Sequence, residues 1–181
     1  MPIKFMGFAL LALFAAVFAQ PGQAESAREI DNDVNRTLQH YYDHVRGGYD
    51  LERRARGVLV FPAIVKAGIG IGGEYGEGAL RIGGGTAGYY NSISASIGFQ
   101  LGVEQRSVVI LFMTDEALDK FRRTDGWKVG VDGSIAIIKL GAGASVDTTK
   151  IASPVVGFIL DPKGLMYNLT LEGSKISRIS R

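Results

Sequence analysis

The stretch "AGIGIGGEYGEG", residues 67–78, decides how the second part of this chain is interpreted, because it holds six glycines in twelve positions. Three of these glycines have the spacing G-x-G-x-x-G of a dinucleotide-binding loop: Gly68, Gly70 and Gly73. Such a loop needs a helix directly after it and an acidic residue about 20 positions further on. Residues 74–82 are instead typical of a turn and a strand, and no Asp or Glu occurs between Glu77 and Glu104. We therefore expect no nucleotide to bind here.

The same stretch alternates apolar and small residues with a period of two, which predicts a β-strand. The pattern returns in "SISASIGFQLGV" (92–103), "IKLGAGASV" (138–146) and "LMYNLTL" (165–171). In residues 92–103 the apolar residues occupy the odd positions, Ile93, Ala95, Ile97, Phe99, Leu101 and Val103. We expect this apolar face to be buried. The glycine and serine faces predict strongly curved, closely packed sheets, as in a barrel or a tight sandwich.

Helical periodicity occurs at two places in the chain. From Glu25 to Arg46 apolar residues recur every three or four positions, and "YDLERRAR" (49–56) continues as a shorter helix after two glycines. "TDEALDKFRR" (114–123) begins with Thr114 as a helix cap and ends in basic residues. The sequence thus predicts an α+β fold dominated by antiparallel strands, with an N-terminal helical segment (25–56) and one inserted helix. Together with the β-rich core (57–181), the helical segment forms one globular unit.

The first 24 residues differ in composition from the rest. Lys4 precedes an apolar run from Phe5 to Ala19, and small residues follow at Gly22 and Ala24. This order is typical of a secretory signal peptide, and we expect cleavage after Ala24 and export to the periplasm or outer membrane of a bacterium. The chain contains no cysteine, which excludes disulfides and thiolate metal sites, and its net charge of +2 gives no case for nucleic-acid binding.

Four segments of the β region resemble the SYLF domain, a lipid-binding module that also binds actin in some eukaryotic members. They are "GVLVFPAIVKAGIGIGGEYGEGAL", "GYYNSISASIGFQLGVEQRSVVILFMTDEALDKF", "GWKVGVDGSIAI" and "GLMYNLTLEGSKI". Together they extend from about Gly57 to Ile179. The resemblance implies a lipid-binding element in the N-terminal segment, which corresponds here to residues 25–56. With an export signal present, the expected ligand is a phospholipid headgroup or a membrane surface of the envelope.

The candidate headgroup contacts are the basic residues Arg53, Arg54, Arg56 and Lys66. Guanidinium groups can hold phosphate oxygens with two hydrogen bonds. Trp127, in a predicted turn, is the candidate aromatic residue at the membrane edge. The alternative function is a structural or protein-interaction module, in which a glycine and serine strand face or an open strand edge docks another envelope protein.

The sequence gives little indication of metal binding or catalysis. His40 and His44 have a spacing that suits two metal ligands, but no third ligand is evident beyond Asp43. Glu74 and Glu77 flank the predicted turn, and paired carboxylates can serve as acid and base, yet no nucleophile accompanies them. We therefore expect neither an enzyme nor a metal or organic cofactor.

Overall fold

The computed structural model describes residues 25–140, 152–164, 171 and 173–181. Within them the helices are α2 (Ala27–His44), α3 (Gly48–Arg54) and α4 (Asp115–Arg123). The strands are β1 (Gly57–Ile82), β2 (Gly85–Phe112), β3 (Trp127–Lys128), β4 (Ala136–Leu140), β5 (Val155–Gly164) and β6 (Lys175–Ile179). The predicted α+β class with an N-terminal helical segment and one inserted helix is confirmed. The leader and the predicted strand residues 141–146 and 165–170 lie outside the described residues.

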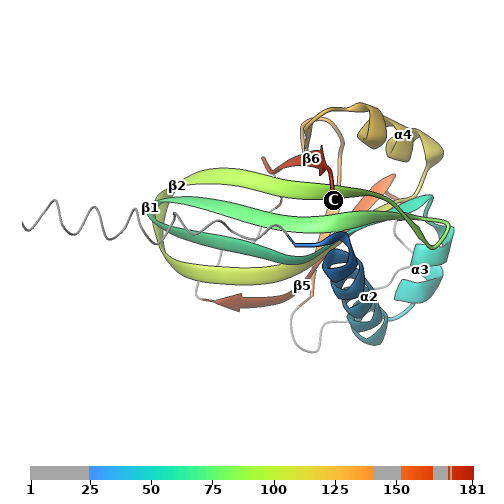
Figure 1. Cartoon of the computed structure of the whole chain (residues 1–181), viewed down its shortest axis with the longest axis horizontal. Helices are drawn as coiled ribbons and strands as arrows, with labels where there is room; N and C mark the ends of the chain where they lie inside the picture. Colours follow the sequence, from blue (N-terminus) through green and yellow to red (C-terminus); the bar gives the residue numbers. More distant parts are fainter. Residues whose placement is uncertain (1–24, 141–151, 165–170, 172) are drawn as a thin grey trace, which may run out of the picture.

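The described strands form one sheet around β2. Its order is β3-β6-β2-β5-β4, and β1 also pairs with β2. The pairs β1–β2, β2–β5, β2–β6 and β3–β6 are antiparallel, and β4–β5 is parallel. β2 can hold three neighbours because it is very long: β5 pairs with its last residues, and β6 pairs with residues 89–93. Figure 1 shows the resulting curved ribbons, with the helices gathered near one end.

The β1–β2 hairpin bends back on itself near its middle. The first half of β1 pairs with the end of β2 as far as Ile69, and the second half pairs with the start of β2 from Ile71 onward, with a register shift between the two. The two halves of β1 then meet, since a Cβ atom added to Gly78 would lie 2.0 Å from the carbonyl oxygen of Val60. Glycine is required at such a contact between two backbones. The expectation that these glycines serve strand curvature is therefore confirmed for β1.

Two parts of the hairpin differ in what covers their faces. Residues 57–64 and 108–112 form the covered end, which is apolar on both faces. Its inward residues join an interior core with α4 and β3; these are Leu59, Phe61, Ile64, Val108, Ile110 and Phe112. Its outward residues pack against α2 and α3; these are Val58, Val60, Val109 and Leu111. Residues 65–76 and 92–107 form the bent end, which carries the candidate site.

The helix ends follow from local hydrogen bonding. Ser26 and Glu29 form a capping box at the start of α2, in which the Ser26 N–H donates to the Glu29 carboxylate at 2.8 Å. The predicted cap of the inserted helix is also present, because the Ala117 N–H donates to the Thr114 hydroxyl at 3.2 Å. These caps satisfy backbone donors that the first turn of a helix leaves without partners. They fix where each helix starts against the sheet.

Candidate functional site

An open groove lies on the outer side of the bent end and extends to the start of α2. It has a volume of about 1040 Å³. Its apolar walls come from Val65, Ile71 and Tyr75 of β1 and from Ile93 and Val103 of β2. A volume of this size is in the range of pockets that bind small molecules.

The groove gathers most of the large apolar side chains that the described structure leaves exposed. The exposed fraction is 74% for Ile71, 62% for Val103, 47% for Tyr75 and Ile93, and 41% for Val65. Of the seven described large apolar residues that are exposed, only Tyr49 and Val131 do not line the groove. Exposed apolar residues gathered in one place indicate a surface that contacts a ligand, a membrane or another protein.

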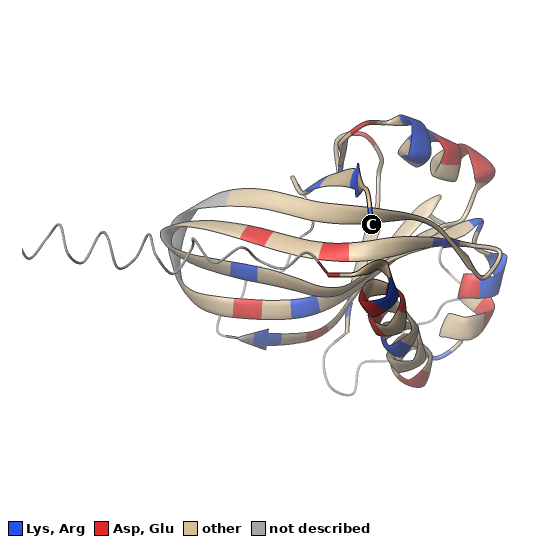
Figure 2. Ribbon diagram, in the orientation of Figure 1, with Lys and Arg blue, Asp and Glu red and all other residues tan. Residues whose placement is uncertain are grey.

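The tip of the bent end lacks charged residues. No charged residue occurs between Lys66 and Glu74 in β1, or between Arg81 and Glu104 across the turn and β2. In Figure 2 the described residues at this tip, away from the helices, are tan. At this end the charged side chain that lines the groove is Glu74, which is 6% exposed and paired with Arg106.

Along β2 at the bent end, polar side chains point inward and apolar side chains point outward, which is the reverse of the sequence prediction. Ser92 is 1% exposed and faces the interior, whereas its apolar neighbour Ile93 faces outward. Glu104 is likewise 1% exposed, next to the exposed Val103. The prediction that the apolar face of residues 92–103 is buried is thus wrong for Ile93 and Val103. The strand itself is confirmed.

A buried cluster of charged side chains explains why the polar face lies inside. The Arg106 guanidinium donates to Glu74 at 2.6 Å and to Glu104 at 3.1 Å, and the Ser174 hydroxyl donates to Glu74 at 2.7 Å. Lys66, at 7% exposure, is the register partner of Glu104. Buried charges need such partners to offset the loss of hydration. The interior of the bent end is therefore polar, and the apolar side chains remain outside.

Glycines shape the groove because they leave space beside its apolar walls. Gly73 lines the groove, and the nearest atom to an added Cβ would be the Ser94 carbonyl oxygen at 3.4 Å. At Gly76, which also lines the groove, an added Cβ would lie 2.6 Å from the carbonyl oxygen of Ala63. Gly73 therefore has room for a side chain that would extend into the groove, whereas Gly76 is held by backbone contact.

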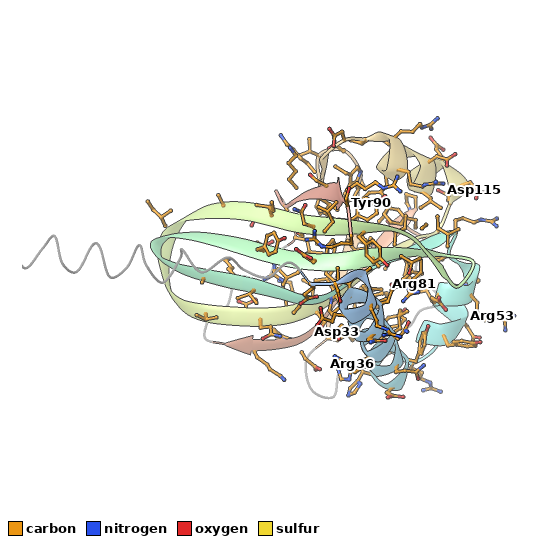
Figure 3. The ribbon with its side chains drawn as sticks, viewed as in Figure 1. Asp33, Arg36, Arg53, Arg81, Tyr90 and Asp115 are labelled. Carbon is orange, nitrogen blue, oxygen red and sulfur yellow. The ribbon has the colours of Figure 1, made fainter. Side chains whose placement is uncertain are left out.

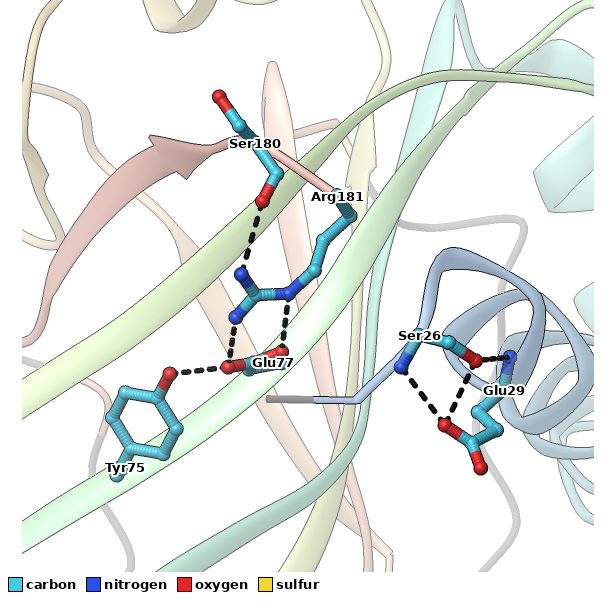
Figure 4. Close-up of polar contacts among 6 residues, drawn as sticks. All are labelled: Ser26, Glu29, Tyr75, Glu77, Ser180 and Arg181. Atoms are coloured by element: carbon cyan, nitrogen blue, oxygen red, sulfur yellow. Dashed lines mark hydrogen bonds and ion pairs between the residues drawn. The ribbon is translucent and has the colours of Figure 1, made fainter. Parts of the chain in front are cut away.

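Carboxylates mark the end of the groove beside α2. Glu25, Asp33 and Glu77 line it there. Figure 4 shows Glu77 accepting hydrogen bonds from Tyr75 and Arg181. Partial burial raises the pKa of Glu25, and the nearby negative charges of Asp33 and Glu77 raise it further. Burial also raises the pKa of Tyr75, with a further contribution from its bond to Glu77. This end of the groove is thus lined by carboxylates, of which Glu77 is paired with Arg181 and Asp33 with Arg36.

Part of the chain matches a known protein family. The sequence model of the Ysc84 family, described as Las17-binding protein actin regulator, matches residues 93–180, just under half of the chain. The chain carries an Ysc84 (SYLF) domain. A comparison with curated proteins gave no match. The matched part runs from Ile93 in the groove to β6, so it includes most of β2 and all of β3 to β6, but not β1.

The basic residues predicted to contact headgroups do not form one site in this SYLF domain. Arg53 and Arg54 are exposed at the end of α3, and Arg53 points away from the sheet (Figure 3). The Arg56 guanidinium lies 3.4 Å from the Asp115 carboxylate, which ties it to α4. Lys66 belongs to the buried interior, so grouping it with the arginines is wrong. The three arginines lie at the helix end of the SYLF domain, away from the groove.

Trp127 is not at an exposed edge. It is 2% exposed, and its ring centroid lies 5.5 Å from that of Phe121 and 6.3 Å from that of Phe112. The predicted membrane-edge role is wrong, because the turn before Trp127 directs the indole into the interior core. The sequence could not show this, since residues in turns are usually exposed.

The other candidate pairs are also placed by the structure. The rings of His40 and His44 are tilted by 44° with centroids 3.9 Å apart, and the His40 Nε2 atom lies beside the Asp161 carboxylate of β5. Within the described part of the chain, no group of three or more His, Asp or Glu residues could hold a metal ion. Glu74 and Glu77 lie in a continuous strand and not around a turn, with Glu74 in the interior cluster and Glu77 at the groove.

The groove residues were missed by the sequence reasoning, although a signal for them was present. A face made of glycine and serine fits a narrow interior where two backbones approach closely. The apolar face of the same strand must then point outward.

In the described residues, no helix is both long and apolar enough to cross a membrane.

Proposed function

We propose that the SYLF domain of this chain is a non-catalytic lipid-binding module whose groove holds an acyl chain. The family supports a binding module in general terms. The observation that carries the proposal is the groove, with five exposed apolar side chains around about 1040 Å³. Burying such side chains against an acyl chain is favourable by about 25 cal/mol per Å².

The proposal places the protein in the bacterial envelope. The apolar run after Lys4 and the small residues before Glu25 support cleavage after Ala24 and export. The partner is then a phospholipid or the membrane surface of the periplasm or outer membrane. Terminal sequencing of the protein from an envelope fraction should find Glu25 as the first residue. A first residue at Met1 would count against export by this route.

Binding of the neutral fluorescent probe N-phenylnaphthylamine tests the groove directly. Gly73→Leu should narrow the groove and reduce the affinity about tenfold, because the nearest atom to a Cβ there is the Ser94 carbonyl oxygen at 3.4 Å and the side chain has room to extend into the groove. Ile71→Asn should weaken binding in the same direction. The matched control is Val131→Asn, since Val131 and Ile71 are both 74% exposed but Val131 does not line the groove.

Two results would contradict the proposal. One is equal probe affinity in the unchanged protein, Gly73→Leu and Val131→Asn. The other is an absence of lipid in the protein purified from its envelope fraction, together with no binding to phospholipid vesicles.

The alternative is that the same surface docks another envelope protein. The family description names a Las17-binding protein, which supports a protein partner for members of this family. Salt-insensitive capture of one envelope protein, lost in Ile71→Asn and kept in Val131→Asn, would favour this alternative over lipid binding.

A further inference from the structure

The lining of the groove divides into an apolar part and an acidic part. Val65, Ile71 and Val103 line it at the bent end, where Glu74 is the only charged residue of the described lining and is buried against Arg106. Glu25 and Asp33, from the start of α2, line the opposite end. Among the described residues of the lining, none is Lys, Arg or His. A ligand that matches both parts has an apolar chain and a head that ends in an ammonium group.

The carboxylates of the acidic part influence one another. The pKa of Glu25 is raised first by burial and then by the charges of Asp33, Glu77 and Glu29. Asp33 and Glu77 have arginine partners, Arg36 and Arg181. These two arginines contact the carboxylates but do not line the groove. A ligand in the groove therefore meets carboxylate oxygens before it meets guanidinium groups.

We infer that the groove selects a lipid with an ammonium headgroup, an aminophospholipid of the ethanolamine type. Its acyl chain lies along the bent end, and its ammonium group contacts the acidic part formed by Glu25, Asp33 and Glu77. This inference rests on the proposed function and adds the class of headgroup. It differs from the sequence prediction, in which arginines hold a phosphate. An ammonium group beside carboxylates gains a charge-assisted hydrogen bond, whereas an anionic head would be repelled.

Two amphiphiles with the same chain and opposite charge test the headgroup preference. Calorimetric titration with dodecylammonium and with dodecanoate, below their micelle concentrations and at low salt, compares the heads directly. A pH of about 9 keeps an alkylammonium group charged and leaves an α-amino group at Glu25 mostly neutral, so the latter does not compete. Dodecylammonium should bind about tenfold more tightly than dodecanoate, and added salt should reduce the difference.

Single substitutions test which residues of the groove contact the ammonium group. Glu25→Gln should lower the dodecylammonium affinity by about two- to fivefold, which is the range for one partly exposed ion pair. Glu116→Gln is the matched control, because Glu116 is exposed on α4 and does not line the groove. Ile71→Asn should weaken both amphiphiles, since each uses the apolar part. Lysophosphatidylethanolamine should likewise bind more tightly than lysophosphatidylglycerol with the same chain.

The outcomes separate this inference from the proposed function. Equal or tighter binding of dodecanoate, with Ile71→Asn still weakening it, would overturn the ammonium preference and leave the lipid groove in place. Binding of neither amphiphile would overturn both. Unchanged preference in Glu25→Gln and in Glu77→Gln would also overturn the inference, because the head would then lie elsewhere. A dimer closed over the groove, seen by light scattering and lost in Ile71→Asn, would replace the lipid by a second copy of the chain.

Discussion

At the covered end of the β1–β2 hairpin, alternate side chains pack into two apolar layers. At the bent end, the side chains of one face belong to a buried ion-pair cluster, and those of the other face line an open groove. Val109 of β2 is fully buried under the helices, but Val103 of the same strand is 62% exposed. The difference does not arise from the strand pattern, which continues through both ends. It arises from what covers each face: α2 and α3 cover the outer face of one end only. The exposed apolar face of the other end is therefore available for binding.

The largest expected effect comes from the interior of the bent end. Arg106→Met should lower the free energy of unfolding by about 3–5 kcal/mol, because it leaves Glu74 and Glu104 buried without their cation. The matched control is Arg36→Met, since the Arg36 side chain is 73% exposed and its pair with Asp33 contributes little. Urea unfolding of both variants measures the difference. Equal stability would show that the interior charges are hydrated and that the bent end is not closed.

The contact between the two halves of β1 gives the next largest effect. Gly78→Ala should cost about 3 kcal/mol, because the added Cβ would lie 2.0 Å from the carbonyl oxygen of Val60 and the backbones must separate. Gly73→Ala should stay within about 1 kcal/mol, since the nearest atom to its Cβ is at 3.4 Å. Thermal unfolding of the two variants compares them. Similar midpoints would contradict the doubled-back path of β1.

Two valines of β2 allow the burial of the outer faces of the two ends to be compared. Val109→Ala should lower the free energy of unfolding by about 2 kcal/mol, because it removes two buried methyl groups. Val103→Ala should change it by less than about 0.5 kcal/mol, because the side chain is already exposed. Denaturant unfolding provides the test. A large cost for Val103→Ala would mean that this face is covered in the folded protein.

Alkaline pH should affect the covered end through the tyrosines of α2. Burial raises the pKa of Tyr41, and burial together with Glu52 raises the pKa of Tyr42 to about 12. A raised pKa contributes stability that is fully present below the unfolded value of about 10 and is lost as the pH rises above it. At pH 11 Tyr41 alone should cost about 1 kcal/mol of stability relative to pH 9.

Phenolate absorbance during a pH titration measures this effect. For Tyr41 and Tyr42, whose pKa values are raised, it should rise only at high pH and together with unfolding. A single transition near pH 10 without loss of structure would show that α2 does not bury its tyrosines against the sheet.

Much of the fold follows from the sequence because local patterns determine it. The period of two gave the strands around residues 67–78 and 92–103, and Thr114 gave the start of the inserted helix. The choice of buried face could not be predicted in the same way. Alternation is symmetric between the two faces of a strand, and only the tertiary contacts of Gly76 and Gly78 show that the small face is inside.

The candidate site was predicted less well than the fold for the same reason. The basic residues Arg53 and Lys66 are 13 positions apart in the sequence, yet one lies on an exposed helix end and the other in the interior. Trp127 was placed at the surface because it follows a turn, but the path of β3 beside β6 directs it inward. Burial of these side chains depends on contacts between distant segments, which spacing along the chain does not contain.

The orientation of β2 at the bent end is the central claim, and the absence of cysteine from the chain allows a direct test. Single variants Ser92→Cys and Ile93→Cys place one thiol on each face of the strand at adjacent positions. In the folded protein, a thiol reagent should label Ile93→Cys rapidly and Ser92→Cys slowly, and both should react equally after denaturation. Rapid labelling of Ser92→Cys with protection of Ile93→Cys would show that the apolar face is buried and that the groove does not exist.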